Sequence, residues 1–250
     1  MYLLKMNGFC KKNARWILGV SLFFNILLAG VVCFYEIRTH NVQEMLTVLG
    51  WCNMDEKQRS GHYFIVDWAA CVKKLNYKAD VAFFGNSITA NSNFQNYFTD
   101  IKIAEFGLHG DRVDGMIRRL PMLQSVNPDK IFVMAGINDL HRSSPETIVE
   151  RYDKLLTLIH DSLPNAKIYV QSILPVNRVK EKLYASNDVI KETNVLIEEC
   201  AKKHNCKFID LNSVYIENGV LPDSLSFDGV HLTQPAYGRW AKVIKPYIYE

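Results

Sequence analysis

Short apolar runs alternate with longer amphipathic stretches from about residue 80 onward, and this alternation limits the fold more than any other feature. Five runs rich in strand-forming residues are bounded by Gly, Pro, Asn or Asp, at 81–84, 101–106, 131–135, 168–172 and 208–211. Continuous apolar runs of this length are typical of strands buried in a parallel sheet. The intervening stretches at 113–125, 145–163 and 188–204, and a closing one at 235–247, have helical spacing. The pattern predicts an α/β fold of three layers, α/β/α, with about five parallel strands.

The composition agrees with a folded domain and excludes two classes of protein. Of 250 residues, 48% are hydrophobic and 12% aromatic, which is enough for a sizeable core and does not fit a disordered chain. The net charge is 29 − 26 = +3, but Lys5, Lys11, Lys12 and Arg15 precede residue 16, so residues 16–250 carry 3 − 4 = −1. A nucleic-acid partner is not expected, because binding phosphates needs a clustered excess of Lys and Arg.

Residues 16–35 form a twenty-residue run without a charge, in which only Ser21 and Asn25 are clearly polar. A helix of this length spans about 30 Å, the thickness of the hydrocarbon core of a bilayer. The basic flank at 1–15 predicts a cytoplasmic tail followed by a transmembrane anchor, with the rest of the chain extracytoplasmic. A cleaved signal peptide and a buried core helix are the alternatives. The first needs a shorter apolar run and a small-x-small cleavage site, and the second is rarely so uniformly apolar.

The remainder divides into a connecting region and a domain. Residues 36–77 are predicted to form a linker or stalk with helical segments near 42–49 and 64–74, and residues 78–250 the α/β domain.

Four polar stretches lie after predicted strands or before the closing helix. They are Gly85-Asn86-Ser87-Ile88-Thr89, Gly107-Leu108-His109-Gly110-Asp111, Gly136-Ile137-Asn138-Asp139 and Asp228-Gly229-Val230-His231. Function gathers at the carboxyl ends of strands in an open parallel sheet. Each stretch alone is typical of a turn or a cap. Together they supply a hydroxyl nucleophile in Ser87, a base in His231, a carboxylate in Asp228 and hydrogen-bond donors for an oxyanion, which is the set that acyl transfer needs.

These stretches resemble the four sequence blocks of the SGNH/GDSL hydrolase superfamily over about residues 78–248. The resemblance implies a flavodoxin-like sheet and ester hydrolysis by Ser87, His231 and Asp228. It also implies an oxyanion hole made by Ser87, Gly110 and Asn138. No metal and no organic cofactor is expected for this chemistry.

Two residues depart from the family pattern, and one of them, Asn86, is also among four residues that flank the predicted site. Asn86 stands where the family has aspartate, and Glu105 stands where many members have asparagine. Because the side chain of residue 86 is not the nucleophile, we expect reactivity to survive. Asn86, His109, Asp139 and His141 are candidate pocket residues, and Asp139 is expected to orient the Asn138 loop rather than to act as a base.

Two cysteines, Cys200 and Cys206, bracket a predicted helix-to-strand turn. They either pair as a disulfide or remain free buried thiols. Zinc binding by this Cys-x₅-Cys pair is not expected, because zinc sites use tighter spacings and a second close pair is missing.

The sequence therefore predicts a membrane-anchored serine ester hydrolase that removes short acyl groups, acetyl above all, from glycans or small esters. A lipase or lysophospholipase acting on lipid esters is an alternative, as is an O-acyltransferase that transfers the acyl group to a glycan. A ligand-binding flavodoxin-like module and an inactive anchor domain are the non-enzymatic alternatives. Phosphate binding gives no reason for Asp228-x-x-His231, and all four family positions are filled.

Overall fold

Apolar strands and amphipathic helices alternate in the computed structural model, which describes residues 24–25, 77–180 and 184–250. The strands are β1 (Val81–Gly85), β2 (Ile103–Gly107), β3 (Lys130–Met134), β4 (Lys167–Gln171) and β5 (Lys207–Ile209). The α-helices are α4 (Ser87–Ala90), α5 (Val113–Arg118), α6 (Pro121–Val126), α7 (Pro145–Ser162), α8 (Asn187–Lys203), α9 (Asn212–Tyr215) and α10 (Gln234–Tyr249), with a 3₁₀-helix, η1, at Phe94–Asn96. All five strands were predicted from the sequence to within two residues at each end.

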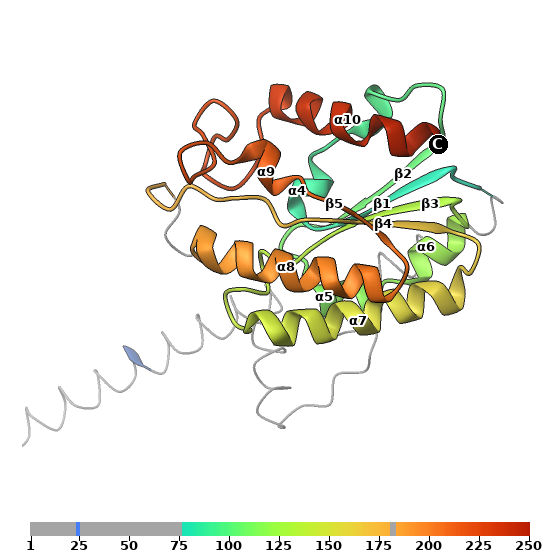
Figure 1. Cartoon of the computed structure of the whole chain (residues 1–250), viewed down its shortest axis with the longest axis horizontal. Coiled ribbons are helices and arrows are strands. Elements are labelled where there is room, and N and C mark those ends of the chain that lie inside the picture. The colour runs from blue at the N-terminus through green and yellow to red at the C-terminus, as the bar shows by residue number, and fades with distance from the viewer. Residues whose placement is uncertain (1–23, 26–76, 181–183) are drawn as a thin grey trace, which may run out of the picture. The chain divides into compact units, whose positions relative to one another are not determined.

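The five strands pair in parallel in the order β2-β1-β3-β4-β5. Helices α5, α7 and α8 cover one face of the sheet and α10 covers the other, which gives the predicted α/β/α layers (Figure 1). The strand order is the flavodoxin-like one, in which the connections reverse direction between β1 and β3. The carboxyl ends of these two strands therefore flank a crevice where side chains from several loops can meet.

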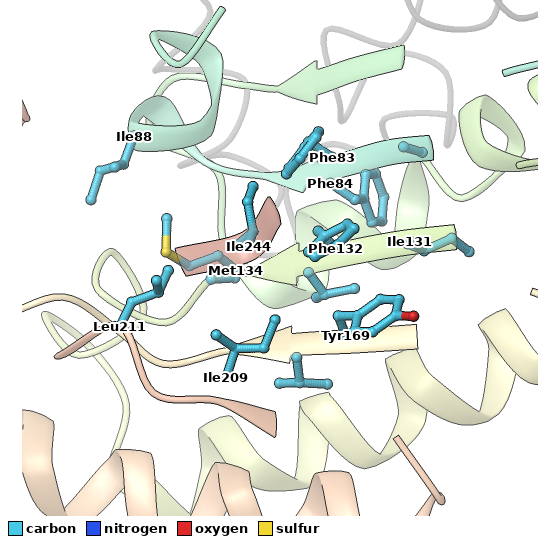
Figure 2. Close-up of a cluster of buried hydrophobic side chains, with 14 of the residues drawn as sticks. Phe83, Phe84, Ile88, Ile131, Phe132, Met134, Tyr169, Ile209, Leu211 and Ile244 are labelled. Atoms are coloured by element: carbon cyan, nitrogen blue, oxygen red, sulfur yellow. The ribbon is translucent and has the colours of Figure 1, made fainter. Parts of the chain in front are cut away.

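A row of aromatic side chains crosses the sheet on the face that α10 covers. Phe83, Phe132 and Tyr169 occupy matching positions on β1, β3 and β4, and their rings stack with centroids 5.0 and 4.6 Å apart. Figure 2 shows these side chains on adjacent strands. Phe94 of η1 stacks on Phe83 at 4.2 Å and meets Trp240 of α10 edge-on at 5.1 Å. Large buried rings contribute much of the burial free energy of a core, so this row stabilises the packing of η1 and α10 on the sheet.

Capping residues and prolines explain where two of the helices, α7 and α6, begin. Ser144 caps α7 by accepting a hydrogen bond from the Thr147 backbone nitrogen at 3.4 Å, and Pro145 occupies the first turn, as the sequence predicts. The prediction of a single helix over residues 113–125 is wrong. This stretch divides into α5 and α6, and Pro121, which lacks an N–H, begins the second of them.

Among the residues that the structure describes, no helix combines the length and the apolar character needed to cross a bilayer. The predicted anchor at 16–35 lies outside these residues except for Phe24 and Asn25, which are helical. The predicted helical segments at 42–49 and 64–74 also lie outside them.

Candidate active site

The Ser87 side chain is placed by the turn that joins β1 to α4. Asn86 caps the short helix, and its Oδ1 accepts a hydrogen bond from the Ile88 backbone nitrogen at 3.0 Å. An amide oxygen thus does what a carboxylate would do at this position. The end of β2 packs tightly beside this turn, because a Cβ on Gly107 would lie 2.0 Å from the Ala90 backbone nitrogen. Ser87 is therefore fixed at the carboxyl end of β1.

One imidazole connects Ser87 to Asp228. The Oγ of Ser87 lies 2.9 Å from Nε2 of His231, although the two residues are 144 positions apart in the sequence. On the other side of the ring, Nδ1 of His231 lies 2.6 Å from Oδ2 of Asp228. The second oxygen of Asp228 accepts hydrogen bonds from the backbone nitrogens of Val230 and His231 at 2.9 and 2.7 Å. The hydroxyl, the imidazole and the carboxylate form one chain of hydrogen bonds.

The surroundings keep Asp228 ionised. Partial burial acts to raise its pKa, but hydrogen bonds from the His231 ring, the His231 backbone and the Val230 backbone outweigh burial and lower the pKa below its usual value. A carboxylate at Nδ1 favours the tautomer with a proton on Nδ1. In that tautomer Nε2 is free to accept the Ser87 proton.

Two loops beside Ser87 present amide groups. Gly110, in the loop after β2, has a φ of +72°, a conformation that side-chain-bearing residues rarely adopt. Nδ2 of Asn138, in the loop after β3, donates a hydrogen bond to the Asp111 carbonyl at 2.8 Å. This bond joins the two loops and leaves the second amide hydrogen of Asn138 available to a ligand.

Arg119 supports these loops from beneath, and sequence reasoning missed it. Its guanidinium is almost fully buried and donates to the carbonyls of Gly85 and Phe106 at 2.6 and 2.7 Å and to Oδ2 of Asp111 at 2.6 Å. It also lies 4.4 Å above the Phe84 ring. One side chain thus ties the ends of β1 and β2 to the residue that follows Gly110.

The four candidate pocket residues occupy different environments. Asn86 is buried as a cap, whereas His109 and His141 are exposed, and the His141 ring lies 4.6 Å from the Tyr184 ring. Asp139 is fully buried and joins the loop after β3 to the start of α5.

Asp139 accepts hydrogen bonds from the Val113 backbone nitrogen at 3.3 Å and from Arg151 at 3.2 Å. Burial raises its pKa to about 6 despite these donors. These hydrogen bonds fix the Asp139 side chain against α5 and α7, and its role in orienting the Asn138 loop stays a prediction.

Two exposed apolar side chains belong to the loops of the candidate site. The Phe227 ring is 64% exposed and stacks beside the His231 ring at 5.9 Å. Leu108 is 40% exposed, and its backbone nitrogen donates to the Gly85 carbonyl at 3.1 Å. Sequence reasoning did not single out either residue, because an apolar residue in a loop carries no sign of its neighbours.

Cys200 and Cys206 are both free and buried. Of the two alternatives that the sequence left open, the structure therefore has the free thiols.

The fold and these loops define an esterase-type α/β/α domain, and comparison with known proteins agrees. Residues 83–239 match the model of the GDSL-like lipase/acylhydrolase family. The chain belongs to this family, within the SGNH/GDSL hydrolase superfamily, and is a carboxylic ester hydrolase whose substrates are esters.

Similar proteins include platelet-activating factor acetylhydrolase IB subunit alpha2 of Rattus norvegicus. It is 27% identical over 200 residues, which cover 77% of this chain and 82% of the relative. Among solved structures, a GDSL-like lipase from Bacteroides thetaiotaomicron is 20% identical, with a TM-score of 0.63 over 74% of this chain and 97% of the other. The acetyl xylan esterase AlAXEase is 20% identical, with a TM-score of 0.56 over 67% and 98% of the two chains. The two solved structures share the fold.

Proposed function

We propose that Ser87, His231 and Asp228 form the catalytic triad of this ester hydrolase. The observation that carries the proposal is the continuous chain of hydrogen bonds from the Ser87 hydroxyl through both nitrogens of His231 to Asp228. A serine hydroxyl is a weak nucleophile until a neighbouring base can take its proton. The 2.9 Å contact with Nε2 supplies that base.

In the first half of the reaction, Nε2 of His231 takes the Ser87 proton while Oγ attacks the ester carbonyl carbon. Asp228 holds the ring in the required tautomer and stabilises the imidazolium that forms. The tetrahedral intermediate then collapses, and His231 returns the proton to the departing alcohol. In the second half, His231 takes a proton from the water that attacks the acyl-enzyme. When the second tetrahedral intermediate collapses, His231 returns this proton to Ser87 Oγ, and the carboxylic acid leaves.

The negative oxygen of each tetrahedral intermediate needs hydrogen-bond donors that are already in place. We assign this part to the backbone N–H groups of Ser87 and Gly110 and to the side-chain amide of Asn138. The Asn138–Asp111 hydrogen bond and the Arg119 contacts support the assignment, because they hold the donating loops rigid before substrate arrives.

We propose short acyl esters, in particular acetyl groups on glycans or small alcohols, as the substrates. Two of the similar proteins carry an acetyl ester in their names, one an acetylhydrolase and the other an acetyl xylan esterase. Lipid acyl esters are the second candidate, and the exposed Phe227 ring, which stacks beside His231, favours it.

A fluorophosphonate probe, which bonds covalently to activated serines, tests the triad. We expect labelling of the full chain and no labelling of Ser87→Ala; undiminished labelling of that variant would reject the assignment.

A series of nitrophenyl esters of increasing acyl length tests the substrate class. A maximum at acetyl or propionyl supports short acyl groups, and a maximum above octanoyl supports lipid esters instead.

We also propose that residues 16–35 anchor the enzyme in a membrane with the catalytic domain extracytoplasmic, on the basis of the uncharged run and its basic flank. Fractionation of cells that express the full chain tests this. Release by alkaline carbonate washing would contradict an integral anchor.

A further inference from the structure

A second group of chemically reactive side chains lies in the helical layer, apart from the ester site. Asp153 of α7, Cys200 of α8 and His204 directly after α8 bring a carboxylate oxygen, a thiol sulfur and an imidazole nitrogen within 4.8 Å of one another. The mechanism proposed above uses none of them. Figure 1 shows α7 and α8 side by side on the same face of the sheet.

Helical geometry explains why these three groups meet. Cys200 and His204 are four residues apart, so they lie one turn apart on the same face of α8 and its cap. Nε2 of His204 already lies 2.9 Å from Oδ1 of Asp153, which α7 presents from the neighbouring helix.

We propose that Asp153, Cys200 and His204 bind a zinc ion. One thiolate, one imidazole and one carboxylate form a ligand set that zinc accepts, at about 2.0–2.3 Å from the metal. Ligand atoms around a tetrahedral zinc then lie about 3.3–3.8 Å apart. The cluster therefore reaches this geometry with side-chain movements of about 1 Å and no rearrangement of the helices.

A cavity beside the cluster provides an entry path and room for water as the fourth ligand. Its volume is about 500 Å³, and Asp153 and Cys200 are among its lining residues. Glu146, Glu150 and Glu199 line it as well. Their charges attract a cation toward the cluster.

The ammonium group of Lys203 competes with a metal ion for the Asp153 carboxylate. Its ammonium nitrogen lies 2.6 Å from Oδ1 of Asp153, the same oxygen that His204 contacts, while its side chain is 69% exposed. On zinc binding, the Cys200 thiol releases its proton to solvent and the Lys203 ammonium moves away from Asp153 into water. The lysine thus makes a specific prediction possible: its removal should tighten metal binding.

The test uses the purified full chain after chelator treatment, with Zn²⁺ titrated against a chromophoric chelator and Co²⁺ as a spectroscopic probe of sulfur coordination. We expect one zinc per chain and a thiolate-to-cobalt absorption band. Cys200→Ser and His204→Gln should each weaken zinc binding by more than about 100-fold. Cys200→Ser should also remove the thiolate-to-cobalt absorption band. Lys203→Met should strengthen binding several-fold.

The matched controls are Cys206→Ser, a neighbouring buried thiol outside the cluster, and Lys202→Met, an adjacent exposed lysine paired with Glu198 at 2.7 Å. Both should bind zinc as the parent does. Unchanged zinc affinity in folded Cys200→Ser and His204→Gln would overturn the proposal, as would an equal loss in Cys206→Ser. If Cys200→Ser does not fold, His204→Gln and Lys203→Met decide the question, because their side chains lie at the edge of the cluster.

Discussion

Two clusters in this domain contain nearly the same residue types in different arrangements. At the carboxyl end of β1, the His231 ring lies between a hydroxyl and a carboxylate, with one nitrogen 2.9 Å from Ser87 and the other 2.6 Å from Asp228. In the helical layer, Nε2 of His204 faces Asp153 instead.

The Cys200 sulfur in the second cluster also differs from an activated nucleophile in its protonation. Burial raises the pKa of the Cys200 thiol to about 11, so it is protonated at neutral pH in the metal-free protein. The chemistry of an acid, a base and a nucleophile therefore depends on which ring nitrogen faces which group, and not on the residue types alone. The first arrangement moves a proton toward and away from a hydroxyl, and the second offers three ligand atoms.

The largest expected difference between the clusters is in turnover when each nucleophilic atom is removed. Ser87→Ala should lower kcat for nitrophenyl acetate by about 10⁵- to 10⁶-fold, because no covalent intermediate can form. Cys200→Ser should leave kcat unchanged. Steady-state kinetics with circular dichroism as the folding control measure both, and a Cys200→Ser enzyme as inactive as Ser87→Ala would contradict the distinction.

The two carboxylates should also differ. Asp228→Asn should lower kcat by about 10⁴-fold, because an amide at this position favours the wrong imidazole tautomer. Asp153→Asn, which removes the carboxylate that faces His204, should not affect hydrolysis. Similar losses in the two variants would show that the helical cluster takes part in catalysis.

Arg119 holds the loops of the ester site in place and takes no part in the proposed reaction, so its substitution should change stability. Arg119→Met leaves Asp111 buried without its partner, which typically costs about 3–5 kcal/mol of unfolding free energy. Burial already raises the pKa of Asp111 even with Arg119 beside it. Urea denaturation should show the loss, and the double variant Arg119→Met with Asp111→Leu should recover part of it. A double variant less stable than the single one would argue against an uncompensated charge.

Asn138→Ala should reduce kcat by about 10²- to 10³-fold with a small change in KM, because its amide is needed mainly in the transition state. Thermal denaturation checks that the fold persists. A rise in KM at constant kcat would assign Asn138 to substrate binding instead.

A further effect is expected in the pH dependence of stability that comes from Asp139. Its pKa is about 6 in the folded protein, above the ordinary value of 3.8. Between about pH 4 and pH 6 the folded state therefore holds a proton that the unfolded chain has released, so this group lowers stability as pH rises through that window. The full effect is on the order of 3 kcal/mol above pH 6.

Asp139→Asn should remove this dependence. The unfolding free energy of the parent relative to the variant should fall by that amount from pH 4 to pH 7, as followed by urea denaturation at each pH. Parallel curves for the two proteins would contradict the assignment to Asp139.

The strands and the residues of the candidate site were predictable because each depends on a short stretch of sequence. A buried strand needs only a few consecutive apolar residues between breakers. Ser87, Gly110 and Asn138 follow such strands, and His231 precedes the closing helix. Arg119 was not predictable. An arginine on an amphipathic helix is ordinarily exposed, and its burial depends on carbonyls at Gly85 and Phe106, which the sequence does not place beside it.

The sequence by itself determined the α/β alternation, the strand ends and the set of groups available for acyl transfer, because spacing and residue type act on the local backbone. Only the tertiary structure decided the partners of each group. The strand order places residues 87 and 231 at hydrogen-bond distance, and the packing of α7 on α8 brings Asp153 to Cys200 and His204. Contacts between distant segments depend on how the layers assemble, and no local pattern encodes their distances.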